Sequence, residues 1–125
     1  MPRVSVVTSV YNGETYLKEC IESILNQTFS DFEYIILNNG STDNTANILK
    51  LYTDPRLRVI HQENLGISRS LNKGIDLSNS DLIARLDADD YSMPQMLEKQ
   101  VNFMEKHPDI VLCGSRWLEL VGEKL

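Results

Sequence analysis

Two sequence patterns alternate along this chain, and this alternation constrains the fold more than any other feature. Short apolar runs rich in β-branched residues favour strands buried on both faces, and apolar residues three or four positions apart favour helices packed on one side. The expected strands are residues 4–10, 32–37, 57–61, 81–86 and 110–113. A helical pattern follows each of the first four strands. The order predicts an α/β fold with a Rossmann-like, mostly parallel sheet and helices on both faces.

Local signals indicate how three of the helices begin or pack. Thr42 or Asp43 is expected to cap the second helix, and Ser92 with Gln95 matches the Ser-x-x-Gln pattern of a capping box before the fourth. Gly74 is expected to interrupt the third helix. That helix is indicated by Ile67, Leu71, Ile75 and Ser78, which lie at helical spacing.

The composition limits the possible functions. The chain has 125 residues, 42% of them apolar, which suits a single domain with a substantial core. A net charge of -6 disfavours nucleic acid as a partner, because the overall charge would not attract a phosphate backbone. The sequence shows no apolar run of about 20 residues and opens like a strand, so we expect a cytoplasmic location. Cys20 and Cys113 lack metal-binding spacing and are expected to be buried thiols.

Three loops follow strands and are expected to meet at one edge of the sheet. They are residues 9–13, 38–42 and 87–90. In open α/β sheets, ligands bind beyond the carboxyl ends of the strands, near the point where the strand order reverses. These loops are therefore the first candidates for a binding site.

The third of these loops carries Asp87, Asp89 and Asp90. Three ionised carboxylates so close together repel one another unless a cation lies between them. Mg²⁺ and Mn²⁺ prefer hard oxygen ligands and share their coordination shell with phosphates, so the Asp-x-Asp pattern suggests a bound diphosphate. A solvated acidic loop is the plainer alternative.

Neighbouring side chains each have two interpretations. Tyr11 could stack on a nucleotide base or cover the sheet edge, and residues 38–43 could contact that base or serve only as turn and cap. Arg85 could pair with an aspartate or contact a diphosphate. Arg69 and Lys73 could reach a phosphate or remain solvated.

Four segments, in this order and spacing, resemble the N-terminal half of the family 2 glycosyltransferases. They are VSVVTSVYN at 4–12, SILNQTF at 23–29, NGSTDNT at 39–45 and ARLDADD at 84–90. Further segments resemble the bacterial branch that builds surface polysaccharide and lipopolysaccharide, namely 64–68, 70–74, 94–100 and 110–115. The resemblance covers nearly the whole chain and implies a GT-A fold.

This resemblance implies a donor site. A nucleoside-diphosphate sugar, with a UDP-sugar as the first expectation, would lie across the strand ends with its base along Ser9, Val10 and Tyr11. Asp87 matches a position that contacts the ribose or the metal, and Asp89 matches the ligand of an Mn²⁺ or Mg²⁺ ion that bridges the diphosphate. The implied reaction is inverting transfer of the sugar to an acceptor hydroxyl, with the metal neutralising charge on the leaving group.

The chain departs from the family at Asn38 and Asn39, where most relatives have two aspartates. The second position is expected to meet the base, so Asn39 is assigned to donor binding. Its carbonyl can accept a hydrogen bond as a carboxylate would, but its NH₂ group adds a donor. Uracil recognition could therefore be weaker, or another base could be preferred.

Residues 1–125 are interpreted as one donor-binding domain that ends before the acceptor-binding half. The general base and the acceptor site are expected beyond residue 125, so no catalytic residue is assigned within the chain. The expected acceptor is a saccharide or a lipid-linked molecule, and the longer protein is expected to associate peripherally with the inner face of the membrane. Trp117 and residues 118–121 are expected to form a packing surface for the second half.

Two other classes of function stay open. A non-catalytic nucleotide- or sugar-binding module would need the same loops without an acceptor site. An aspartyl-phosphate phosphotransferase also carries Asp-x-Asp after a strand, but its nucleophile is expected after the first strand, where this chain has Ser-Val-Tyr-Asn at 9–12. The phosphotransferase is therefore the weaker alternative.

Overall fold

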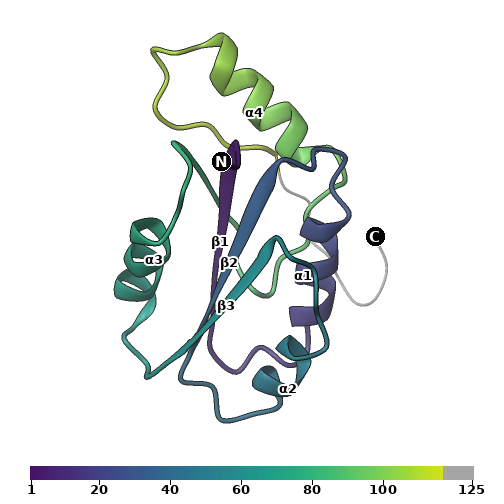
Figure 1. Ribbon diagram of the computed structural model, residues 1–125, viewed down its shortest axis with the longest axis vertical. Coiled ribbons are helices and arrows are strands. Elements are labelled where there is room, and N and C mark those ends of the chain that lie inside the picture. Colours follow the sequence, from purple (N-terminus) through teal and green to yellow (C-terminus); the bar gives the residue numbers. More distant parts are fainter. Residues whose placement is uncertain (117–125) are drawn as a thin grey trace.

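The computed structural model of the protein describes residues 1–116. Its centre is a sheet of four parallel strands, β1 (Val4–Val10), β2 (Phe32–Asn39), β3 (Leu57–Gln62) and β4 (Leu82–Arg85). The strand order is β3-β2-β1-β4, so the chain builds outward from β1 on one side and then returns to its other side. Strands β1, β2 and β3 run from top to bottom in Figure 1, which places the loops that follow them at the lower edge.

Four helices complete the described part of the fold: α1 (Leu17–Leu25), α2 (Thr45–Leu49), α3 (Ile67–Asp76) and α4 (Met96–Lys106). Figure 1 shows α1 and α2 on one face of the sheet, α3 on the other, and α4 at the end near the start of β1. The predicted α/β class with helices on both faces is confirmed. Among the described helices, none has the length and apolar character needed to cross a membrane.

The core has one layer on each face of the sheet. Alternate side chains of a strand point to opposite faces. Val6 and Ile36 accordingly pack in one layer with Ile21 of α1, and Val7 and Leu37 pack in the other, beneath α3. All eight residues of β2 are buried, including the polar Glu33, Asn38 and Asn39, so this central strand has no solvent-facing side.

Helix α3 meets the sheet through Ser70, Leu71 and Gly74 rather than through all of its apolar residues. Ile67 and Ile75 are 55% and 46% exposed, whereas Ser70 and Gly74 are buried against the sheet. A Cβ atom added at Gly74 would lie 2.4 Å from Cγ1 of Val7. The helix continues through Gly74 rather than breaking there, because the missing side chain allows the helix backbone to approach the strands.

The predicted fifth strand at residues 110–113 is wrong. These residues have no regular secondary structure, and Val111 and Leu112 are 92% and 84% exposed. An apolar run becomes a strand only beside another strand that satisfies its N–H and C=O groups, and no described strand pairs with this one. Cys113 is consequently half-buried rather than buried, while Cys20 is fully buried as expected. The packing surface expected at Trp117 and residues 118–121 lies outside the described residues.

Neither expected cap occupies the N-cap position of its helix. The N-cap of α2 is Asn44, which makes no side-chain cap hydrogen bond, although the carboxylate of Asp43 accepts the N–H of Thr45, the first residue of α2, at 2.9 Å. The capping box at Ser92 is wrong, because α4 begins only at Met96 and has no side-chain cap. Ser92 is instead buried and accepts a hydrogen bond from Nε2 of Gln27 at 3.2 Å, which fastens its segment to the region after α1.

Candidate functional site

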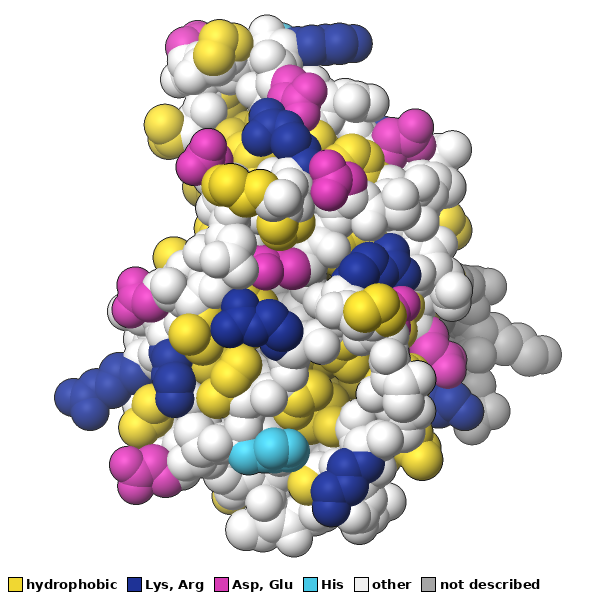
Figure 2. Space-filling view, viewed as in Figure 1, with side chains coloured by type: hydrophobic (Ala, Val, Ile, Leu, Met, Phe, Trp, Pro, Cys, Tyr) yellow, Lys and Arg dark blue, Asp and Glu magenta, His cyan; other side chains and the backbone are white. Residues whose placement is uncertain are grey.

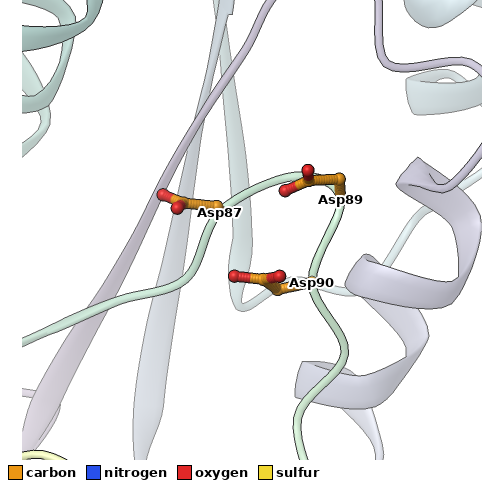
Figure 3. Close-up of side chains that lie close together, drawn as sticks. All are labelled: Asp87, Asp89 and Asp90. Atoms are coloured by element: carbon orange, nitrogen blue, oxygen red, sulfur yellow. The ribbon is translucent and has the colours of Figure 1, made fainter. Parts of the chain in front are cut away.

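An acidic loop, Asp87–Asp90, follows β4 at the carboxyl end of the strand. The N–H of Leu86 still bonds to the carbonyl of Val7 at 3.2 Å, and the N–H of Asp90 then bonds back to the carbonyl of Asp87 at 3.0 Å. This turn brings oxygen atoms of Asp87, Asp89 and Asp90 within 4.8 Å of one another. Figure 3 shows the three side chains projecting to the same side of the loop. The structure therefore brings together the carboxylates that the sequence analysis singled out.

The electrostatics of the acidic loop reflect this crowding. Partial burial and the negative charges of Asp89 and Asp87 raise the pKa of Asp90 above its ordinary value. Arg85 donates a hydrogen bond from Nε to Asp87 at 3.1 Å, so one of its two interpretations, pairing with an aspartate, is observed. No described residue forms an ion pair with Asp89. The loop is an open rim on which Asp89 in particular is accessible to a cation.

At the end of β1, the accessible side chain is an aromatic ring rather than a set of polar groups. Tyr11 is 54% exposed, whereas Val10 is 1% exposed and belongs to the core. The hydroxyl of Ser9 donates to the hydroxyl of Ser70 at 2.7 Å, on the α3 side of the sheet. Of these three predicted donor-binding residues, Tyr11 is thus the one that presents its side chain freely.

Asn12 organises the neighbouring loops and was not singled out from the sequence. Its backbone has a φ of 51°, in the left-handed region that asparagine tolerates. Its side-chain oxygen accepts the N–H of Thr42 at 2.7 Å and the N–H of Asp43 at 3.3 Å. Asparagine directly after a strand was the available signal, because this residue combines left-handed geometry with backbone hydrogen bonding. The loop after β1 is therefore tied to the loop after β2.

Asn39 is buried and fully engaged by the protein. Its side-chain oxygen accepts from Nε2 of Gln62 at 3.1 Å and from the N–H of Leu65 at 2.9 Å. Its NH₂ group donates to Asn64 at 3.3 Å and to the carbonyl of Gly66 at 3.4 Å. Asn39 thus fixes the segment between β3 and α3 in this structure, and a contact between Asn39 and a base stays a prediction.

Asn38 points to the other face of the sheet. It is 5% exposed, and its NH₂ nitrogen lies 3.1 Å from Nδ1 of His61. Its side-chain oxygen is buried and has no hydrogen-bond partner among the described residues. The two adjacent asparagines therefore differ in that one amide is saturated and the other keeps an unused acceptor.

Charged side chains are dispersed over the rest of the visible surface. Figure 2 shows Lys and Arg side chains spread singly over one face, with Asp and Glu side chains between them. On the face that Figure 2 shows, the two signs of charge are intermixed.

Comparison with known families identifies this arrangement. Residues 5–124 match the family model described as Glycosyl transferase family 2. The chain belongs to glycosyltransferase family 2. The family 2 match includes the acidic loop and all the strands, and it confirms the resemblance seen in the sequence motifs.

Relatives and solved structures agree with this family assignment. EpsH of Bacillus subtilis (strain 168) is 41% identical over 115 residues, which are 90% of this chain and 33% of EpsH. S. aureus TarS 1-349 in complex with UDP-GlcNAc superposes with a TM-score of 0.79 at 27% identity, over 85% of this chain and 32% of that one. This family 2 chain therefore spans about a third of the length of EpsH.

A second solved structure adds a metal complex. The mannosyltransferase PcManGT from Pyrobaculum calidifontis, in complex with GDP-Man and Mn²⁺, has a TM-score of 0.67 at 25% identity. The match covers 72% of this chain and 28% of the mannosyltransferase. Both of these structurally similar proteins contain a bound nucleotide sugar.

Proposed function

We propose that this chain is the donor-binding domain of an inverting glycosyltransferase that binds a nucleoside-diphosphate sugar together with Mn²⁺ or Mg²⁺. The observation that carries the proposal is the cluster of Asp87, Asp89 and Asp90 at the carboxyl end of β4 in a family 2 chain. Support for the ligand class comes from TarS with UDP-GlcNAc and from PcManGT with GDP-Man and Mn²⁺. A UDP-sugar is the first candidate donor.

The residues present suit a divalent cation. Three carboxylates with oxygens within 4.8 Å supply the hard ligands that Mn²⁺ and Mg²⁺ prefer, and the exposed loop leaves room for water and phosphate oxygens. Asp89 is the primary ligand, because Asp87 already accepts a hydrogen bond from Arg85. Asp87 is the second ligand, and it would exchange part of its contact with Arg85 for the metal or the ribose.

The remaining donor contacts follow from the same edge of the sheet. The exposed ring of Tyr11 offers a flat surface for a base, and the backbone of Ser9 and Val10 lines the strand end beneath it. Asn39 is adjacent in the neighbouring strand and would contact the base edge only after giving up one of its present hydrogen bonds. The nucleotide would therefore extend from Tyr11 toward the acidic loop.

The proposed reaction is a single displacement at the anomeric carbon of the donor sugar. The oxygen of an acceptor hydroxyl forms the new bond while the bond from that carbon to the diphosphate breaks, and the hydroxyl proton passes to a general base. A bound divalent cation supplies charge neutralisation for the departing nucleoside diphosphate. The acceptor is a saccharide or a lipid-linked saccharide of a surface polysaccharide or lipopolysaccharide.

Calorimetry on the purified chain tests this assignment. UDP, GDP and their sugars are titrated with and without Mn²⁺, and we expect nucleotide affinity to rise when Mn²⁺ is present. In Asp89→Ala this affinity should drop to the metal-free value of the wild type. Asp31→Ala, which removes an exposed carboxylate near the start of β2, is the matched control and should bind as the wild type does.

Two outcomes would contradict the assignment. If Mn²⁺ does not change the nucleotide affinity of the wild type, the proposed role of the metal is wrong. If Asp89→Ala binds nucleotide in the presence of Mn²⁺ as tightly as the wild type does, Asp89 is not a ligand of the metal. In the longer protein, turnover of donor and acceptor separates a transferase from a binding module that does not catalyse.

A further inference from the structure

Three polar side chains lie buried directly beneath the acidic loop. They are Thr8 of β1, Tyr34 of β2 and Cys20 of α1, and each is 0% exposed. Burial of a hydroxyl is unfavourable unless the hydroxyl is hydrogen-bonded, and valine or phenylalanine would fill nearly the same space without polar atoms. The polar atoms of this buried triad therefore have a role other than filling the core.

The hydrogen bonds of the buried triad lead to the backbone that precedes the acidic carboxylates. The hydroxyl of Thr8 donates to the carbonyl of Leu86 at 2.6 Å and lies 2.8 Å from the hydroxyl of Tyr34. Because the single proton of Thr8 goes to Leu86, Tyr34 is the donor in the second bond. The thiol of Cys20 donates to the carbonyl of Asp87 at 3.4 Å.

The hydrogen bonds of the buried triad take the place of strand pairing just beyond the end of β4. The pairing between β1 and β4 stops at Val7 and Arg85, and the chain then turns away from β1. The carbonyls of Leu86 and Asp87 are the next two acceptors, and buried acceptors require partners. Side chains of the buried triad provide these partners, and the carbonyl of Asp87 also closes the turn to Asp90. The triad thus holds the chain at the point where the carboxylates begin.

We propose that Thr8, Tyr34 and Cys20 are positioning residues that fix the backbone of the acidic loop and so set the relative placement of the Asp87 and Asp89 carboxylates. That a cation binds between those carboxylates rests on the function proposed above. None of the three side chains reaches the cation itself, since all three bond to backbone atoms or to one another. They act by limiting the conformations open to the loop before a ligand binds.

A pair of substitutions at Thr8 separates positioning from general stability. Thr8→Val removes the hydroxyl and keeps the volume, whereas Thr8→Ser keeps the hydroxyl and removes a buried methyl group. Amide exchange of Leu86 and Asp90, measured without metal, reports the order of the loop. We expect about tenfold faster exchange in Thr8→Val, the ratio that one lost hydrogen bond produces. Thr8→Ser should stay close to the wild type in this measurement, although it too loses core contacts.

A second measurement links the buried triad to metal binding. The affinity for Mn²⁺ alone should fall by about tenfold in Thr8→Val, as is usual when the support of a metal ligand is removed, and Thr8→Ser should retain most of it. Ile35→Val removes a methylene from the other core layer, beneath α3. It is the control for a loss of stability that leaves the hydrogen bonds of the acidic loop intact. Its Mn²⁺ affinity should match that of the wild type.

The outcomes distinguish this inference from the proposed function. Unchanged exchange of Leu86 and Asp90 in Thr8→Val, or equal damage in Thr8→Ser, would overturn the positioning role. A wild type that binds no Mn²⁺ would count against the proposed function, while the exchange data would still decide whether the triad orders the loop. If Thr8→Val does not fold, Tyr34→Phe replaces it, because it removes the donor to Thr8 and keeps the aromatic ring.

Discussion

At the scale of single residues, the acidic loop contains a destabilising charge. Burial together with Asp89 and Asp87 raises the pKa of Asp90. A carboxyl group whose pKa is higher in the folded than in the unfolded state favours folding only while it is protonated. Its ionisation therefore lowers the free energy of unfolding as the pH rises through the raised pKa. At neutral pH the metal-free protein is therefore less stable than it would be with this carboxyl protonated, and a bound cation would offset the difference.

Asp90→Asn should therefore stabilise the metal-free protein at pH 7. The expected gain in the free energy of unfolding is about 0.5 kcal/mol, because solvent screening limits the repulsion between exposed charges. The gain should vanish as the pH falls below the ordinary aspartate value of 3.8, where the wild-type carboxyl is protonated in both the folded and the unfolded state. Urea unfolding at both pH values measures it, with Asp31→Asn as a control that should show no gain. An Asp90→Asn variant no more stable than the wild type at pH 7 would show that the repulsion is negligible.

Local patterns predict residues at this site better than they predict hydrogen-bond partners. The acidic loop was visible in the sequence because Asp87, Asp89 and Asp90 lie within four positions after an apolar strand. The saturation of Asn39 was not, because its partners come from residues 62–66, more than twenty positions away. The role of Asn12 was also missed, since an amide can be a donor, an acceptor or both and the sequence does not say which group it meets.

At the scale of elements, close packing rather than apolar periodicity determines how α3 meets the sheet. Periodicity selected Ile67 and Ile75, which the structure exposes, because counting apolar residues ignores the distance between a helix and its sheet. Ser70 and Gly74 let the α3 backbone approach Val7 and allow few alternatives in size. The absent strand at residues 110–113 has a similar cause, since strand formation depends on a pairing partner that local composition does not reveal.

Gly74→Ala should destabilise the protein although alanine is the better helix former. The new methyl would lie 2.4 Å from Cγ1 of Val7 and 2.9 Å from Cδ1 of Leu37. Overpacking of this kind costs about 1–3 kcal/mol, which exceeds the roughly 1 kcal/mol that alanine gains in helix propensity. Thermal or urea unfolding measures the difference.

A double-mutant cycle identifies the cause of the expected loss at Gly74. In a Val7→Ala background the space beside Gly74 opens, so the additional cost of Gly74→Ala should shrink or disappear. Asn72→Ala, on the exposed side of α3, is the control and should be neutral or slightly stabilising. An equal cost of Gly74→Ala in both backgrounds would mean that the clash with Val7 is not the reason for close packing.

At the scale of the whole molecule, carboxylates at the two ends of the strands differ in how the protein surrounds them. Glu33, near the start of β2, is 8% exposed and accepts hydrogen bonds from Ser5 at 2.6 Å and from the N–H of Asn79 at 2.7 Å. Burial alone would raise the pKa of Glu33, but these bonds and the nearby Arg58 outweigh it and lower the pKa. The carboxylate at this edge is satisfied by the protein itself, whereas Asp89 of the acidic loop, the proposed metal ligand, has no ion-pair partner among the described residues. The satisfied carboxylate and the proposed metal ligands thus lie at opposite ends of the strands.

Glu33→Gln should consequently make the protein less stable at neutral pH and less sensitive to acid. Hydrogen bonds to a charged group contribute about 1.5–3 kcal/mol, and the amide replaces one acceptor oxygen with a donor. If the amide oxygen keeps the bonds from Ser5 and the N–H of Asn79, the NH₂ group faces two other donors, the side-chain NH₂ of Asn79 and Arg58. Because the pKa of Glu33 is lower in the folded state, the wild-type advantage is complete above the ordinary value of 4.5 and is lost as the pH falls through the folded-state pKa. Urea unfolding at pH 7 and at several values below 4.5 should show the two proteins converging. Glu63→Gln, at an exposed position after β3, should follow the wild-type curve, and a constant gap between wild type and Glu33→Gln at every pH would show that Glu33 acts through packing rather than through its charge.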